Sequence, residues 1–306
     1  MASLSGVMNR QKYTDLFFSR LPFIDEIMFL NFDAVDLVYP EIFTVRDSRR
    51  AFEDITGLTG FGLFSEKNEG EKVDYDSLQQ AFDKRFIHLT YGKGFQISKE
   101  AMDDDIDGAI TDAGPALAQA AQVSIETQIW AVFNNSFGSE QTPDGVSLFD
   151  ASHVIVDGPV FSNLITGDLS QENLEAANNI FGSMVNERNL LIQAQPEILL
   201  IPFELQYLAA ELLDSQLRSD TSNNAVNAVH SSRLGIRPVV SKYLTSATNW
   251  FMGVRPGAHR ILVYWREQPD VDHTMDFETG NMKTKMTYRL SFGAADWRGW
   301  VGGNGS

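Results

Sequence analysis

One long helical pattern constrains the fold of this chain more than any other feature of its sequence. Between Ile106 and Phe137, apolar residues recur at steps of three to four, with a weaker stretch around Ala113, and this spacing is typical of the buried face of an α-helix. Pro115 predicts that the main segment begins or kinks there. At about 1.5 Å per residue the main segment would be roughly 33 Å long, so we expect a scaffold helix.

Three further elements are predicted between the scaffold helix and residue 217. Ser170 is a good N-cap, and Leu169 and Leu174 occupy hydrophobic-staple positions, so a second helix is expected to begin after Ser170. Residues 196–202 are mostly apolar between two prolines, which indicates a fully buried strand. A third helix is expected to follow over residues 203–217.

The C-terminal part contains the clearest strand of the chain. Its two faces alternate: Met282, Met286, Tyr288, Leu290 and Phe292 share one face, and Lys283, Lys285, Arg289 and Ser291 share the other. The turn at 278–281 predicts a hairpin with residues 270–277. Other strands are predicted at 85–98, 237–241, 250–254 and 260–266. Because strands and helices do not alternate regularly, the predicted fold class is α+β.

The N-terminal part is less regular. Residues 1–50 are aromatic-rich and contain two prolines, so an extended arm with a short helix near residues 13–19 is expected. Residues 53–72 are rich in glycine and charge and show no helical period. Two interpretations stay open: a flexible surface loop, or a long two-stranded excursion, since strand-like residues flank the charged tip.

Composition excludes several classes of function. The chain has no cysteine, which excludes disulfides and thiolate metal sites, and its five histidines lack zinc-ligand spacing, so no metal or cofactor is expected. The net charge of −17 disfavours sequence-specific groove binding to DNA and contact with anionic membranes. Neither a signal peptide nor a membrane helix is predicted.

The stretch 148–158 raises the question of catalysis. It places Asp150, Ser152, His153 and Asp157 within eight residues. A serine hydrolase uses side chains of these three types. Consecutive residues of a strand point to opposite faces, however, and no Gly-x-Ser-x-Gly occurs. We favour a structural role, in which Asp150 and Ser152 form local turn bonds and His153 packs beside them. A hydrolase that uses Ser152 and His153 is kept as an alternative.

Several phrases, taken in order, resemble the major capsid proteins of tailed bacteriophages. Gly145-Val-Ser-Leu-Phe-Asp-Ala-Ser-His153 is similar to a Gly-x-x-Leu-Phe-x-x-x-His phrase of that family, and Pro196-Glu-Ile-Leu-Leu-Ile-Pro202 to a Pro-x-x-Leu-Leu-Val-Pro phrase. The passages 82–104 and 289–298 resemble the strand-to-helix passage and the final strand and tail. The resemblance covers about residues 50–300 and is nearest to Mu-like prophage major head subunits.

The resemblance implies the Hong Kong 97-like capsid fold. Its parts would be an N-terminal arm (1–50), an E-loop (51–85), a peripheral domain (86–194 and 261–306) with a spine helix at about 108–137, and an axial domain (195–260). The implied protein is not an enzyme. Its hexamers and pentamers would form the icosahedral head shell around double-stranded DNA, without sequence-specific binding. An encapsulin-like nanocompartment is the alternative with the same fold.

The resemblance also implies partners and a location. Portal, scaffolding and head-decoration or head-completion proteins would be partners, and the chain would be assembled in the bacterial cytoplasm and end in the virion. Two sets of charges are candidates for an assembly interface: an acidic tip of the E-loop (Glu66, Glu69 and Glu71) and a basic stripe on the terminal strand (Lys283, Lys285 and Arg289). The stripe would be either an ordinary solvated face or the receptor of a neighbouring subunit's acidic tip.

Overall fold

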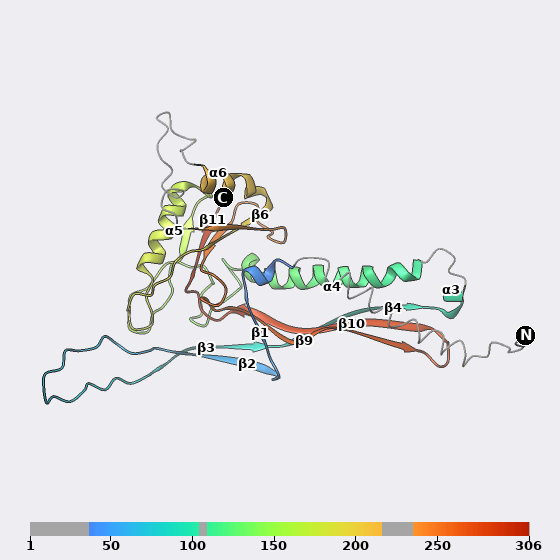
Figure 1. Ribbon diagram of the computed structural model, residues 1–306, viewed down its shortest axis with the longest axis horizontal. Coiled ribbons are helices and arrows are strands. Elements are labelled where there is room, and N and C mark those ends of the chain that lie inside the picture. Colours follow the sequence, from blue (N-terminus) through green and yellow to red (C-terminus); the bar gives the residue numbers. More distant parts are fainter. Residues whose placement is uncertain (1–36, 104–108, 216–234, 306) are drawn as a thin grey trace, which may run out of the picture. The chain divides into compact units, whose positions relative to one another are not determined.

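A computed structural model describes residues 37–103, 109–215 and 235–305 (Figure 1). Most of the expected N-terminal arm, including the helix predicted at 13–19, lies outside these residues. The described chain groups into two compact units. The first contains Leu89–Ile125 and Glu267–Arg289, and the second contains Val38–His88, Glu126–Arg266 and Leu290–Ser306.

The scaffold helix and the terminal hairpin run through both units. The helix is α4 (Ala109–Asn134), and it continues through Pro115, so the proline does not begin it. The hairpin consists of β9 (Ile261–Met275) and β10 (Met282–Ala294), which confirms the predicted pairing but merges two expected strands into β9. The four-stranded sheet has the order β1-β9-β10-β4.

The first unit packs the N-terminal part of α4 onto this sheet. β4 (Leu89–Ile97) adjoins β10, and the short helix α3 (Lys99–Asp103) follows it. The core cluster consists of Leu117, Ala118, Ala121 and Met286, with Phe95 and Val271 packed against it. A Cβ atom at Gly94 would collide with the carbonyl oxygen of Thr284, so glycine allows β4 to approach β10 closely.

The alternation predicted for β10 holds from Met282 to Leu290 and then fails. The alternate residues of this stretch are buried, while Lys283 and Lys285 are exposed. Ser291 was expected on the exposed face, but it is buried, and Phe292 is only half-buried. The reason is a polar contact inside the second unit, where Ser291 Oγ lies 3.0 Å from His88 Nδ1.

The second unit is built on a five-stranded sheet with the order β5-β11-β8-β6-β7. The strands are β5 (Leu164–Thr166), β11 (Trp300–Asn304), β8 (Trp250–Gly253), β6 (Ile198–Pro202) and β7 (Arg237–Ser241). β6 pairs parallel to β7 and antiparallel to β8. β11 pairs antiparallel to β8 and parallel to β5. Every residue of β6 is buried, which confirms the strand predicted between two prolines.

Two helices accompany this sheet (Figure 1). α5 (Gln171–Ser183) begins as predicted, because Ser170 Oγ accepts a hydrogen bond from the Asn173 N–H at 3.2 Å. The third helix is shorter than expected. A 3-10 turn, η2 (Phe203–Leu205), precedes α6 (Gln206–Asp214), and the backbone turns extended at Ser215.

An aromatic core joins α4 to the sheet of the second unit. Phe133 lies at its centre, with ring centroids 5.0 Å from Trp300 and 5.1 Å from Phe251. Phe43, which follows the 3-10 turn η1 (Tyr39–Glu41), packs edge-on against Phe133 at 5.5 Å. Edge-on contacts between aromatic rings add to the free energy of burial.

The segment 51–85, which the resemblance implies to be the E-loop and which keeps that name below, is a two-stranded excursion, so one of the two open interpretations is confirmed. β2 (Phe52–Leu58) pairs antiparallel with β3 (Gln80–Ile87), and a long loop joins them (Figure 1, blue to teal). The strand expected over 85–98 is wrong in one respect, since it breaks at His88 between β3 and β4. His88 is buried, and its Nε2 lies 3.0 Å from Ser48 Oγ. Nearby, β1 (Thr44–Asp47) pairs parallel with β9.

Candidate functional site

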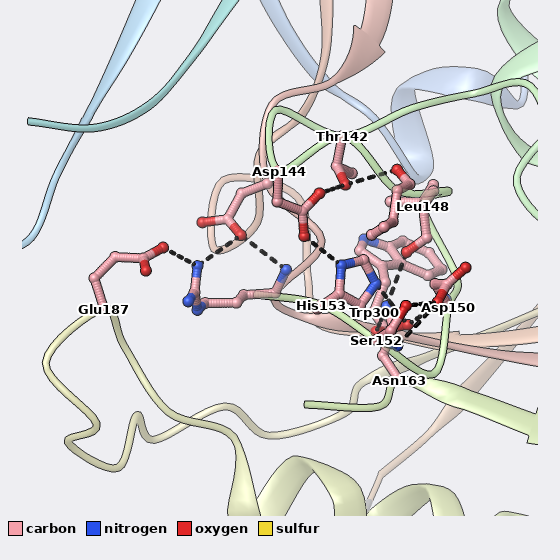
Figure 2. A network of polar contacts seen from close by, with 12 residues as sticks. Thr142, Asp144, Leu148, Asp150, Ser152, His153, Asn163, Glu187 and Trp300 are labelled. Carbon is pink, nitrogen blue, oxygen red and sulfur yellow. Dashed lines mark hydrogen bonds and ion pairs between the residues drawn. The ribbon is translucent and has the colours of Figure 1, made fainter. Parts of the chain in front are cut away.

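The stretch that resembles a serine hydrolase forms a buried polar network. His153 is fully buried, and its Nδ1 lies 2.7 Å from Asp144 Oδ2 (Figure 2). On the other side of the ring, Nε2 lies 3.0 Å from Asn163 Oδ1. The ring also stacks on Trp297, with centroids 4.5 Å apart. We call Asp144, His153 and Asn163 the histidine network.

Asn163 connects this network to the sheet. Its Nδ2 donates to the carbonyl oxygens of Leu148 at 2.9 Å and Trp300 at 3.3 Å (Figure 2). These two acceptors fix the orientation of the amide, so Oδ1 faces His153 and also accepts the Asp150 N–H at 3.0 Å. The network therefore joins the loop before β5 to the C-terminal strand β11.

Ser152 takes no part in a catalytic arrangement. It is exposed, and its Oγ donates to Asp150 Oδ1 at 2.5 Å, while its N–H donates to the same oxygen at 2.9 Å. Both ring nitrogens of His153 are engaged by Asp144 and Asn163 rather than by Ser152. The predicted local turn bonds are confirmed, and nucleophilic catalysis lacks its serine–histidine contact.

Asp144 is held as a carboxylate. Burial opposes its ionisation, but hydrogen bonds from His153, Thr142 and the backbone of Val146 outweigh burial and lower the pKa of Asp144 below its ordinary value of 3.8. A buried carboxylate with several donors is a stable structural element as long as all its partners remain.

A second buried cluster surrounds Arg298. Its Nη1 lies 2.8 Å from Glu187 Oε1 and 3.3 Å from Asp296 Oδ1, and its Nε donates to the Val185 carbonyl at 2.7 Å. The guanidinium also covers the ring of Trp297 at 4.6 Å. Sequence reasoning missed this cluster, because Val185 and Glu187 lie more than a hundred residues before Arg298 and share no motif with it.

The E-loop exposes both charge and apolar surface. Glu66, Glu69 and Glu71 are all exposed, and none of them pairs with a lysine or arginine of the described residues. Large apolar side chains are exposed on both limbs of the loop: Leu58, Phe61, Leu63, Phe64, Val73, Tyr75 and Leu78. Exposed apolar side chains gathered in one loop indicate a surface that another protein covers.

Two members of the basic stripe already have partners in their own hairpin. Lys283 Nζ lies 3.1 Å from Asp276 Oδ2, and Lys285 Nζ lies 3.0 Å from Asp272 Oδ2. The hydrogen bond from Lys283 and further backbone donors lower the pKa of Asp276. Arg289 is half-buried, with no partner for its Nε among the described residues. The stripe is thus less free than the sequence suggested.

Comparison with known proteins places this geometry in a family. The sequence profile described as "Phage capsid protein" matches residues 85–302. No curated protein matches the chain. Among the described residues, no helix is long and apolar enough to cross a membrane, and no cluster of three or more metal-binding side chains is present.

Solved structures share the fold at low sequence identity. The capsid of cyanophage P-SCSP1u is 11% identical over 89% of this chain and 88% of its own, with a TM-score of 0.56. The bacteriophage JBD30 capsid decorated with minor capsid protein trimers is 12% identical over 69% and 92%, with a TM-score of 0.56. A chain of Microbacterium phage Oxtober96 is 11% identical over 86% and 89%, with a TM-score of 0.53.

The family profile matches most of the chain, and phage capsid structures match its fold across both units. This is the family that the sequence phrases resemble. The chain therefore belongs to the phage capsid protein family, and it is a major capsid protein of the Hong Kong 97-like fold, a virion component that forms the shell of a phage head.

Proposed function

We propose that the chain closes an icosahedral shell as hexamers and pentamers and that this shell encloses double-stranded DNA. The family match over residues 85–302 carries the proposal. The exposed apolar side chains of the E-loop support it, because they are expected to need a second copy to cover them. The net charge of −17 suits a wall that holds DNA without binding its sequence.

The proposal includes the finer assignments made from the resemblance. The arm, E-loop, peripheral domain and axial domain would have the boundaries given above. One pairing crosses these boundaries. β11, which lies in the peripheral segment 261–306, pairs with β8, which lies in the axial segment 195–260. Portal, scaffolding and decoration proteins would be partners, and assembly would occur in the bacterial cytoplasm. The JBD30 capsid is decorated with minor capsid protein trimers, which makes a decoration protein a reasonable candidate.

The two alternatives are not favoured. The matching family is that of phage capsids rather than of cargo compartments. Catalysis by Ser152 and His153 is opposed by their hydrogen bonds to Asp150, Asp144 and Asn163. We therefore assign no enzymatic role to the chain.

Size-exclusion chromatography followed by negative-stain electron microscopy tests the proposed function. We expect the purified chain to form closed particles of uniform size. Particles isolated from infected or induced cells are expected to contain DNA. A chain that stays monomeric under all conditions of salt, crowding and scaffold would contradict the proposal, and particles filled with protein cargo would favour a nanocompartment.

We further propose that the basic stripe receives the acidic tip of a neighbouring E-loop. Changing Lys283 and Lys285 to glutamate is expected to slow assembly without unfolding the subunit. Changing Glu66, Glu69 and Glu71 to lysine in the same chain is expected to restore part of the rate. Each exposed pair contributes only about 0–1 kcal/mol, so the effect depends on repetition around the shell. Light scattering during assembly measures it.

The ion pairs inside the hairpin supply the control for this experiment. Lys283 lies 3.1 Å from Asp276, so the exchange Lys283→Asp with Asp276→Lys keeps the pair within the subunit but alters the stripe. If this exchange assembles like the wild type, the lysine acts within its own hairpin and the pairing between subunits is refuted.

A further inference from the structure

The loop after α5 is folded so that it presents a single arginine. An isolated bridge between Val185 and Leu191 closes the loop. Inside it, Asn186 Oδ1 accepts the N–H groups of Arg188 and Leu190, both at 2.9 Å. Asn189 has a φ of 57°, in the left-handed region that asparagine tolerates better than most residues. These contacts fix the backbone from which the Arg188 side chain extends.

Arg188 reaches from this loop to the base of the E-loop. Its Nη2 donates to the Ser77 carbonyl at 2.7 Å and lies 3.2 Å from Asp76 Oδ1. Its Nη1 lies 2.9 Å from Asp157 Oδ2. The arginine side chain is only 17% exposed, so these contacts are partly shielded from solvent. One guanidinium therefore joins the returning limb of the E-loop to two loops of the second unit.

Asp76 extends the attachment to the outgoing limb. Its Oδ2 accepts the Gly62 N–H at 2.8 Å, so a single carboxylate holds both limbs of the E-loop. The hydrogen bond from Gly62 and the charge of Arg188 lower the pKa of Asp76, which is therefore ionised at neutral pH. One step closer to the strands, Thr59 and Gln79 exchange bonds of 3.0 and 3.2 Å.

The remaining part of the loop is expected to depend on this attachment for its direction. Between Leu63 and Tyr75 the side chains are exposed, including Phe64 and the acidic tip. An isolated two-stranded hairpin is marginally stable in water, so it needs support at its base. Fixing such a segment before it binds reduces the ordering that association would otherwise require.

We propose that Arg188 is a positioning residue for shell assembly: by holding Asp76 and Ser77, it sets the direction in which the E-loop leaves its own subunit. This inference rests on the proposed function, in which the E-loop covers a second copy of the chain. The contacts of Arg188 described above all lie within its own subunit. The arginine acts through the E-loop that it holds.

Hydrogen exchange in free subunits tests the attachment without reference to assembly. In Arg188→Ala we expect the amides of Thr59, Gly62 and Gln79 to exchange about tenfold faster, the factor expected from losing a charge-assisted hydrogen bond. Arg188→Lys keeps the positive charge but lacks the several N–H donors of the guanidinium. It should therefore restore only part of the protection of these amides from exchange. Unchanged exchange at these amides in Arg188→Ala would overturn the inference.

Arg85 offers a matched control in the same hairpin. It forms an exposed two-point ion pair with Asp54, at 2.7 and 2.8 Å, and within the described residues it has no hydrogen bond or ion pair with the loop after α5. Arg85→Ala removes the same charge, yet it should leave exchange at Gly62 and the assembly rate near wild type. Arg188→Ala should slow assembly by about the factor by which exchange rises, with little change in the unfolding midpoint. Equal effects of the two variants on assembly would overturn the inference.

A variant of the tip separates this inference from the proposed function. Changing Phe64 and Tyr75 together to serine removes two of the most exposed aromatic rings and leaves Arg188 and Asp76 intact. If this variant fails to assemble while Arg188→Ala assembles normally, the positioning role is wrong and the proposed function stands. If the tip variant assembles like wild type, the E-loop covers no neighbour, so the positioning role fails while the proposed shell stands; if the wild-type chain itself forms no shell, the proposed function fails.

Discussion

Asp144→Ala is expected to lower the free energy of unfolding by about 1–3 kcal/mol, the range found when a buried hydrogen-bonding group is left without its partner. Both side chains are inaccessible, with Asp144 2% and His153 0% exposed. Without the carboxylate, the ring nitrogen at 2.7 Å loses its partner, and the hydroxyl of Thr142 keeps only the carbonyl oxygen of Val146 at 3.2 Å. Denaturant unfolding of free subunits, followed by tryptophan fluorescence, measures the change.

Ser152→Ala is the matched control for this prediction. Ser152 is exposed and bonds only its neighbour Asp150, so we expect a change within about 0.5 kcal/mol. A catalytic site would show the reverse pattern, with Ser152 essential for activity and reactive toward a fluorophosphonate probe. Labelling of Ser152 would contradict the structural role of the network, as would a loss below about 1 kcal/mol in Asp144→Ala.

The elements that sequence reasoning found are those whose pattern is local. α4, α5 and β6 each bury a face or a run that is visible within about twenty residues, and Ser170 marks the start of α5 by its own chemistry. For residues 53–72 the sequence left two interpretations open, and the pairing of β2 with β3 decides for the two-stranded excursion. Periodicity and capping act over a few turns, so a single sequence suffices to predict them.

β11 was not predicted, and β9 was predicted as two strands, because tertiary packing decides both. β11 contains Gly302 and Gly303, and glycine disfavours strands. A Cβ atom at Gly302 would collide with the ring of Phe149, and one at Gly303 with the ring of Trp250. β9 continues through Pro269, and β1 pairs only with Leu262–Trp265, so the proline lies where no β1 residue needs its missing N–H.

The buried polar clusters could not be predicted from the sequence for a related reason. Asp144 and His153 are close in sequence, but Asn163 and Trp300 are separated by more than a hundred residues. The same holds for Glu187 and Arg298. Arg188 reaches Asp76 over a similar separation. Nothing in the local composition of these segments distinguishes a buried ion pair from a solvated charge. Only the fold brings the partners together.

The segment where the described chain begins is held by two buried titratable groups. Glu126 of α4 accepts the N–H groups of Val38 at 2.6 Å and Tyr39 at 3.3 Å. Burial raises the pKa of Glu126 above its ordinary value of 4.5, against the effect of these donors. His259 holds the other end of the segment, because its Nε2 lies 2.8 Å from the carbonyl oxygen of Ile42.

His259 must be neutral to make both of its hydrogen bonds. The Ile42 carbonyl only accepts, so Nε2 carries the proton, and Nδ1 accepts the Ile261 N–H at 3.1 Å. A second proton on Nδ1 would face that N–H. Burial accordingly lowers the pKa of His259 from 6.5 to about 4. The unfolded chain therefore binds a proton between these two values, while the folded chain does not.

We expect acid to destabilise the subunit through His259 as the pH falls from 6.5 toward 4. The lowered pKa differs by about 2.5 units from its ordinary value, and each unit corresponds to about 1.4 kcal/mol, so the full loss is about 3 kcal/mol. Glu126 acts in the opposite direction, because its raised pKa makes the folded state bind a proton more readily as the pH falls toward 4.5. The lowered pKa values of Asp76, Asp144 and Asp276 contribute only near and below pH 3.8.

The difference between wild type and His259→Gln isolates the histidine from these other groups. Glutamine can still donate to the Ile42 carbonyl but cannot take up a proton, so the variant should be less stable at pH 7 and lose about 3 kcal/mol less between pH 6.5 and 4. Denaturant unfolding at half-unit steps of pH measures both slopes. Equal slopes in the two proteins would show that His259 does not titrate in this window and that the link to Ile42 survives acid. A smaller slope in the variant would show that the folded subunit keeps His259 neutral, as its hydrogen bonds to Ile42 and Ile261 require.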